Sequence, residues 1–126
     1  MGISCGIDII EVDRIRGAME KRGQAFKERV FTENEIIYCE MKKASKYHSY
    51  AARFAAKEAV SKALGTGIGR GVDWKDIEVL NDDYEKPFAV LTGSANDYYN
   101  SMKAKSMSLS LSHCKNYAVA QVVIET

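Results

Sequence analysis

The chain has 126 residues, of which 46% are hydrophobic and 28% charged, and its formal net charge is +1. This composition is typical of a globular protein long enough to bury a core, and it excludes a disordered or low-complexity chain. No apolar run approaches the ~20 residues of a membrane span and no leader pattern follows Met1, so we expect one cytoplasmic domain over residues 1–126.

The small net charge hides a segregation along the chain. Residues 42–62 carry six basic side chains and one acidic one, whereas residues 73–86 carry six acidic and two basic ones. The basic segment would attract a polyanionic ligand or an acidic protein, although a solvated charged face is the simpler interpretation. Because Cys5, Cys39 and Cys114 lack paired spacing, we expect a reducing compartment and neither a zinc site nor a disulfide framework.

The first element expected is a mostly buried strand over Ile3–Ile10, rich in isoleucine. Asp8 lies in its middle, and a carboxylate there is costly to bury unless it is paired or bound to a metal. The alternative is that Asp8 points to an open face or meets an arginine. Val12, Ile15 and Met19 then recur at helical spacing, which predicts a helix ending at about Gly23.

A second helix is indicated by the sequence Thr32-Glu-Asn-Glu35, which matches a capping box. The helix should continue through Ile36, Ile37 and Met41. Capping gives Glu35 a structural role, which makes it a weaker candidate for a catalytic group. The basic residues 42–46 that follow are expected to form a loop.

The central helix should run from Tyr47 or Tyr50 to Leu64, because alanine-rich sequence favours helix. Arg53 and Lys57 are four residues apart, a like-charge pair that mildly disfavours an isolated helix and makes more sense if an anion lies between them. Glu58 stands beside these bases, and Lys62 follows one turn later. An acid among bases suggests that a metal and a phosphate are held together.

Alternate glycines follow this helix, from Gly65 to Gly71. Gly65 is the natural C-cap, and Gly67 indicates a turn or a close backbone approach. The loop matches neither standard nucleotide motif, because a dinucleotide fingerprint opens a helix and a P-loop ends in Gly-Lys-Ser/Thr.

The second half of the chain reads mostly as strands. A strand pair is expected over Ile77–Leu80 and Phe88–Thr92, then a helix around Ala95–Met102, then a hairpin of Met107–Ser112 with Tyr117–Ile124. The pattern predicts a small α+β domain with helices packed on a mostly antiparallel sheet. His113 falls at a strand end, where a histidine is more often a simple turn residue.

Three separated stretches together resemble one family. They are Gly6-Ile-Asp8-Ile-Ile-Glu-Val, Arg53-Phe-Ala-Ala-Lys-Glu58-Ala-Val-Ser-Lys62-Ala and Ser110-Leu-Ser-His113, with order and spacing kept. Over nearly its full length the chain resembles the holo-acyl-carrier-protein synthases, which are small bacterial 4'-phosphopantetheinyl transferases. The resemblance implies transfer of the phosphopantetheine arm of coenzyme A to a serine of an apo acyl carrier protein. Adenosine 3',5'-bisphosphate would be released, and the reaction would serve fatty acid biosynthesis.

The resemblance also implies roles for single residues. Asp8 and Glu58 match the catalytic carboxylates that bind Mg²⁺, an ion that prefers oxygen ligands and often keeps water and substrate phosphates in its shell. The positions that match coenzyme A contacts are Arg53, Lys57 and Lys62 at the phosphates, His113 beside the nucleotide, and Gly65 and Gly67 in the glycine loop. The base that takes the serine proton could be Glu58, a metal-bound water or Glu35, of which the first two are favoured.

Members of the family are commonly homotrimers with each site between neighbouring subunits, so Asp8 and Glu58 would come from one subunit and other contacts from the next. The family's first helix receives the acidic carrier protein, which implies a docking surface at Arg14, Lys21 and Arg22.

The residues alone are compatible with two other functions. Paired carboxylates beside bases would also suit a Mg²⁺-dependent phosphohydrolase or nuclease, which would cut a nucleotide or coenzyme A with water as the nucleophile. A nucleic-acid binder could use the basic residues 42–62, but Glu58 near their centre and a shortage of aromatic side chains for stacking argue against it.

Overall fold

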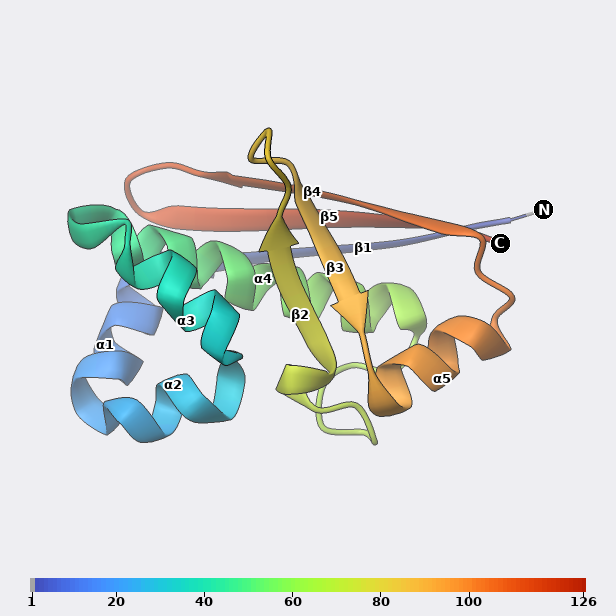
Figure 1. Cartoon of the computed structure of the whole chain (residues 1–126), viewed down its shortest axis with the longest axis horizontal. Coiled ribbons are helices and arrows are strands. Elements are labelled where there is room, and N and C mark those ends of the chain that lie inside the picture. The colour runs from blue at the N-terminus through green and yellow to red at the C-terminus, as the bar shows by residue number, and fades with distance from the viewer. Residues whose placement is uncertain (1) are drawn as a thin grey trace.

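Helix α4 (Lys46–Leu64) runs along one face of a three-stranded antiparallel sheet in the computed structural model, which describes residues 2–126 (Figure 1). The strand order in this sheet is β1-β5-β4, and β2 and β3 form a separate antiparallel hairpin. The remaining elements, in chain order, are β1 (Ile3–Glu11), α1 (Val12–Arg22), α2 (Gln24–Val30), α3 (Glu33–Glu40), a 3-10 turn (Lys43–Ser45), a second 3-10 turn (Trp74–Asp76), β2 (Ile77–Asn81), β3 (Pro87–Leu91), α5 (Gly93–Ser101), β4 (Ser106–His113) and β5 (Tyr117–Glu125).

Small residues let α4 lie unusually close to β1. A Cβ atom added at Gly6 would meet the carbonyl oxygen of Ala59 at 1.9 Å, so only glycine fits at that point of the strand. One pleat earlier, the Ser4 hydroxyl donates to the carbonyl oxygen of Ala63 over 2.6 Å. Since alternate residues of a strand share a face, Asp8 is the next residue after Ser4 and Gly6 to point toward α4.

Most of the predicted elements, and the α+β class itself, are confirmed. The capping box at Thr32 is present in full, and Gly65 ends α4 in a left-handed conformation. Helix α2 was not predicted. It is only seven residues long, and its one sequence signal is the buried pair Phe26 and Val30, four residues apart.

The prediction of a mostly buried first strand is wrong for the single chain. Ile3, Ile7 and Ile9 are 72%, 61% and 64% exposed, because all the helices of the described chain lie on the other face of the sheet (Figure 1). Val119 and Val123 of β5 pair with Ile9 and Cys5 and add to this apolar surface, which we call the outer sheet face. An uncovered apolar face of this kind marks an interaction surface.

Helix α3 buries a polar residue and a cysteine and exposes two of its hydrophobic side chains. Ile37 and Met41 are exposed, whereas Glu35 and Cys39 are buried. At the end of this helix, Glu40 accepts hydrogen bonds from Tyr50, Lys27 and Lys46. The Tyr50 hydroxyl, 2.6 Å away, contributes most to lowering the pKa of Glu40 to about 2, and the two lysines add to the effect while partial desolvation opposes it. The carboxylate thereby joins α2, α3 and α4.

Within residues 2–126, no helix is both long and apolar enough to cross a bilayer.

Candidate functional site

Asp8, Glu58 and Lys62 lie together at the free edge of β1, and we call them the acidic cluster. Lys62 Nζ is 3.0 Å from Asp8 Oδ1 and also donates to the Ile7 carbonyl oxygen over 2.9 Å. Glu58 and Lys62 are four residues apart on α4, so both face the strand. Burial raises the pKa of Glu58, the charge of Asp8 raises it further, and Lys62 partly opposes the shift.

The acidic cluster fits a divalent cation by its chemistry. The charge of Asp8 disfavours ionisation of Glu58, and a hard cation between the two carboxylates would relieve this repulsion. Mg²⁺ typically takes only one or two protein carboxylates. Within the described residues, no group of three or more His, Cys, Asp and Glu side chains forms a metal site. The remaining ligands of a bound ion would therefore be water and substrate oxygens.

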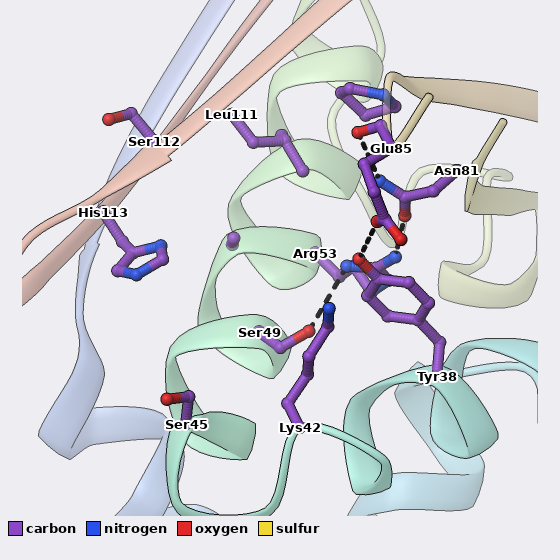
Figure 2. A pocket seen from close by; sticks show the side chains of 12 residues that line it. Tyr38, Lys42, Ser45, Ser49, Arg53, Asn81, Glu85, Leu111, Ser112 and His113 are labelled. Atoms are coloured by element: carbon purple, nitrogen blue, oxygen red, sulfur yellow. Dashed lines mark hydrogen bonds between the residues drawn. The ribbon is translucent and has the colours of Figure 1, made fainter. Parts of the chain in front are cut away.

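A second group of side chains surrounds a cavity of about 550 Å³ between α4, the β2–β3 turn and the end of β4, which we call the hairpin pocket (Figure 2). A volume of this size suits a nucleotide-sized ligand. The side chains that line it are Tyr38, Lys42, Ser45, Ser49, Ala52, Arg53, Asn81, Glu85, Pro87, Leu111, Ser112 and His113.

Arg53 is fixed at the inner end of the hairpin pocket. Its guanidinium donates to the Asn81 side-chain oxygen and, over 3.4 Å, to the Ser49 hydroxyl, and it stacks 4.0 Å from the centre of the Tyr38 ring. Its Nε is buried and has no hydrogen-bond partner among the described residues. Arg53 is only 3% exposed, so it would act on an anion in the pocket mainly through its positive charge.

His113 ends β4 and lines the opposite side of the pocket (Figure 2). Its ring centre is 5.2 Å from that of His48 on α4, and His48 Nε2 is 3.0 Å from the carbonyl oxygen of Lys115 in the β4–β5 turn. Lys42 is exposed, and its ammonium lies 4.7 Å from the centre of the Tyr38 ring. The pocket thus gathers two cations and an imidazole.

The predicted site residues fall on opposite sides of α4. At about 100° per residue, Lys62 projects roughly 180° away from Arg53 and Glu58 roughly 140° away. The sheet repeats this division, because Asp8 is on edge strand β1 and His113 is on the other edge strand, β4, with β5 between them. One chain therefore holds two half-sites, the acidic cluster and the hairpin pocket, which do not share a cavity.

The structure does not support a phosphate-binding role for Lys57. Its side chain is 0% exposed, and its ammonium donates to Glu35 Oε1 at 2.7 Å and to the carbonyl oxygens of Trp74 and Ile77 at 3.0 and 2.6 Å. All three N–H groups are used, so none remains for a ligand. Burial lowers the pKa of Lys57, and the charge of Glu35 opposes that shift. The anion that Lys57 binds is therefore the protein's own Glu35.

Glu35 is equally unsuited to act as a base. It is 0% exposed, and besides Lys57 it accepts the backbone N–H groups of Thr32 and Val79 at 2.8 and 2.7 Å. Its role is to hold α3, α4 and β2 together. Of the acids considered from the sequence for proton transfer, Glu58 alone stands beside Asp8.

The glycines of the loop are required for their backbone conformation. Gly65 and Gly67 have φ values of 87° and 72°, and a Cβ added at either would meet nothing within 4 Å. Their N–H groups are bound to carbonyl oxygens of the last turn of α4. Contact between these glycines and coenzyme A stays a prediction.

Most of the hairpin pocket was missed by sequence reasoning. Ser45, just before α4, and Ser49 and Ala52 within it recur at helical spacing beside Arg53, and this periodicity could have been noticed. Asn81 and Glu85 could not have been found in this way, because they reach the pocket only through the packing of the β2–β3 hairpin.

Comparisons with known proteins identify the family to which the chain belongs. Residues 4–122 match the family described as the 4'-phosphopantetheinyl transferase superfamily. A holo-[acyl-carrier-protein] synthase of Ruminiclostridium cellulolyticum is 57% identical over 124 residues, which cover 98% of this chain and 92% of the relative. The crystal structure of the Helicobacter pylori synthase in complex with coenzyme A has a TM-score of 0.85 at 36% identity, covering 96% of this chain and 99% of that one. The Bacillus anthracis synthase in complex with CoA (3',5'-ADP) has a TM-score of 0.80 at 44% identity, covering 98% and 96%.

Proposed function

The chain belongs to the 4'-phosphopantetheinyl transferase superfamily as a holo-[acyl-carrier-protein] synthase, and we propose that its active site forms where the acidic cluster of one subunit meets the hairpin pocket of the next. The enzyme transfers the phosphopantetheine arm of coenzyme A to a serine of the apo carrier protein, a step of fatty acid biosynthesis. The match over residues 4–122 supports treating the chain as one transferase domain.

The separation of the two half-sites by α4 is the observation that carries this proposal. In this proposal the nucleotide of coenzyme A binds the hairpin pocket and its pyrophosphate binds the acidic cluster. One chain places these two sets of residues on opposite sides of α4, so a single subunit does not bring them together. The outer sheet face supports a second copy as the missing neighbour, because Ile3, Ile7 and Ile9 leave a large apolar surface uncovered. A closed ring of three subunits would bury this face in every copy and complete three equal sites.

In this assembly Asp8 and Glu58 would hold Mg²⁺ through their carboxylate oxygens. The ion, when bound, neutralises charge on the pyrophosphate and on the leaving bisphosphate. Lys62, already 3.0 Å from Asp8, can move its flexible ammonium toward the same phosphate oxygens. Glu58 is the group to accept the proton of the attacking serine, since Glu35 is buried in its ion pair with Lys57.

The hairpin pocket of the neighbouring subunit would bind the nucleotide half of coenzyme A. Arg53, with an unpartnered buried Nε, and the exposed Lys42 supply positive charge for its phosphates, and His113 lies across the cavity. Bound at both ends, coenzyme A would be fixed in position for in-line attack. Catalysis would rest mainly on this positioning and on charge neutralisation, as in phosphoryl transfer generally.

The carrier protein would dock on α1. Arg14, Lys21 and Arg22 are all exposed, and Arg14 and Lys21 are seven residues apart, so they share one side of the helix. An acidic partner would be drawn to this surface. Replacing Arg14 by glutamate should raise the KM for the carrier protein while leaving the KM for coenzyme A unchanged. The three free cysteines are compatible with a cytoplasmic location.

The test is a transfer assay read by mass spectrometry. The protein is incubated with Mg²⁺, coenzyme A and an apo carrier protein, and the carrier should gain the mass of phosphopantetheine. Release of adenosine 3',5'-bisphosphate without any gain in carrier mass would instead identify a hydrolase and overturn the proposal.

A further inference from the structure

Glu85, in the turn between β2 and β3, has an unusual backbone conformation. Its φ is 62°, in the left-handed region that glycine enters without cost and that other residues rarely occupy. Residues held in such conformations cluster at binding sites, where the surrounding structure imposes them. Glu85 also lines the hairpin pocket, so this strained residue lies at a candidate site.

The turn itself is firmly tied. Glu85 donates its N–H to the Asp82 carbonyl oxygen over 3.0 Å, and its own carbonyl oxygen accepts the Asn81 side-chain amide over 3.0 Å. The Asp82 carboxylate accepts the backbone N–H groups of Tyr84 and Lys86 at 2.8 and 2.9 Å. These bonds fix the direction in which the Glu85 side chain leaves the backbone.

The side chain is held at its far end as well. The Tyr38 hydroxyl donates to Glu85 Oε2 over 2.7 Å, and the two side chains point toward one another in Figure 2. Among the described residues, no hydrogen bond or ion pair reaches Glu85 Oε1. A carboxylate is an acceptor only, so Oε1 presents an unused acceptor at the wall of the pocket.

A carboxylate in this place restricts which part of an anionic ligand can face it. Phosphate oxygens would be repelled by Glu85 and drawn to Arg53 and Lys42. If the pocket holds the nucleotide half of coenzyme A, as proposed above, the N–H donor of that half is the 6-amino group of adenine. We propose that Glu85 is a specificity-determining residue whose Oε1 accepts a hydrogen bond from this amino group, with Tyr38 as the positioning residue.

Isothermal titration calorimetry on the native enzyme tests this inference with two ligands. They are adenosine 3',5'-bisphosphate and purine riboside 3',5'-bisphosphate, which lacks only the amino group. We expect the wild-type enzyme to bind the first roughly tenfold more tightly, as a hydrogen bond to a charged acceptor would give. Glu85→Gly should bring the ratio close to one. This variant should still fold, because glycine adopts a positive φ readily, and thermal melting will check it.

Two further variants make the test specific. Tyr38→Phe keeps the ring against Arg53 but frees the carboxylate, so it should lower the ratio while phosphate binding persists. Tyr84→Ala changes an exposed residue of the same turn that does not line the pocket, and should leave the ratio at its wild-type value.

Equal binding of the two ligands by the wild-type enzyme, or an unchanged ratio in Glu85→Gly, would overturn this inference and leave the proposed function intact. A third ligand, 2'-deoxyadenosine 3',5'-bisphosphate, lacks the ribose 2'-hydroxyl. The inference would also fall if Glu85→Gly removed the preference for adenosine 3',5'-bisphosphate over this ligand, since Glu85 would then contact the ribose. If the wild-type enzyme bound neither ligand, the assignment of the hairpin pocket to the nucleotide would fail, and this inference with it.

Discussion

Replacing Lys57 by methionine tests whether this lysine stabilises the fold or binds phosphate. The substitution keeps most of the side-chain volume but removes the ammonium, which makes three hydrogen bonds inside the protein. Glu35 would be left as a buried charge without its counterion, and the carbonyl oxygens of Trp74 and Ile77 would lose their donor. Removing one partner of a buried ion pair costs about 3–5 kcal/mol, a large share of the roughly 5–15 kcal/mol that holds a domain folded.

The free energy of unfolding can be measured by urea titration, followed by the fluorescence of Trp74, the only tryptophan. We expect Lys57→Met to lose about 3–5 kcal/mol. The double variant Lys57→Met, Glu35→Gln should lose less free energy of unfolding than the two single variants lose together, because it no longer buries the uncompensated Glu35 charge.

The matched control is Lys62→Met, five residues further along the same helix but half exposed. This change should cost less than about 1 kcal/mol of stability, since exposed ion pairs contribute little, but should greatly reduce transfer. The reasoning would be refuted if Lys57→Met unfolded at nearly the wild-type urea concentration and instead bound coenzyme A weakly. Lys57 would then be the phosphate ligand that the sequence predicted.

Three further predictions concern the metal, the outer sheet face and acid stability. Asp8→Ala or Glu58→Ala should abolish Mg²⁺-dependent transfer at an unchanged melting temperature, and retained activity in either would remove that residue from the metal site. Ile7→Lys, which puts a charge on the outer sheet face, should reduce the oligomer to smaller species in light scattering, whereas an intact oligomer would argue against this interface. Because the pKa of Glu40 falls from 4.5 to about 2 on folding, its contribution to stability is present above about pH 5 and is lost as the pH falls toward 2. Glu40→Gln should therefore unfold with a flatter pH dependence across that window, and a curve parallel to that of the wild type would contradict this role.

Local sequence patterns predicted much of the fold because they act through local physics. The capping box at Thr32, the glycine cap at Gly65 and the alternation over Met107–Ser112 each depend on residues close in sequence, and each is present. The orientation of β1 was misjudged because its isoleucines were assumed to face the core. The small residues Ser4 and Gly6 face α4 instead, and their tight packing is visible only once the helix is in place.

The candidate site was partly predictable for the same reason. The predicted pairing of Asp8 with Glu58 is supported, because both lie in the acidic cluster. Arg53, Lys57 and Lys62, however, were predicted to form one group of bases around the same phosphates. The nine-residue spacing between Arg53 and Lys62 is enough to predict that the two side chains leave α4 in opposite directions. The burial of Lys57 could not be predicted in this way, because its partner Glu35 comes from another helix and its other acceptors from beyond the glycine loop.

The central claim, that each active site takes one half from each of two subunits, is tested most directly by complementation. One variant carries Asp8→Ala and Glu58→Ala, and the other carries Lys42→Glu and His113→Ala, so that each lacks one half-site. The two are assayed separately and after being unfolded and refolded together in equal amounts. Each alone should be inactive, and the mixture should recover about a quarter of wild-type activity, because random assembly places two intact halves together at about one interface in four. A mixture as inactive as its components, despite forming mixed oligomers, would show that each chain builds its site alone.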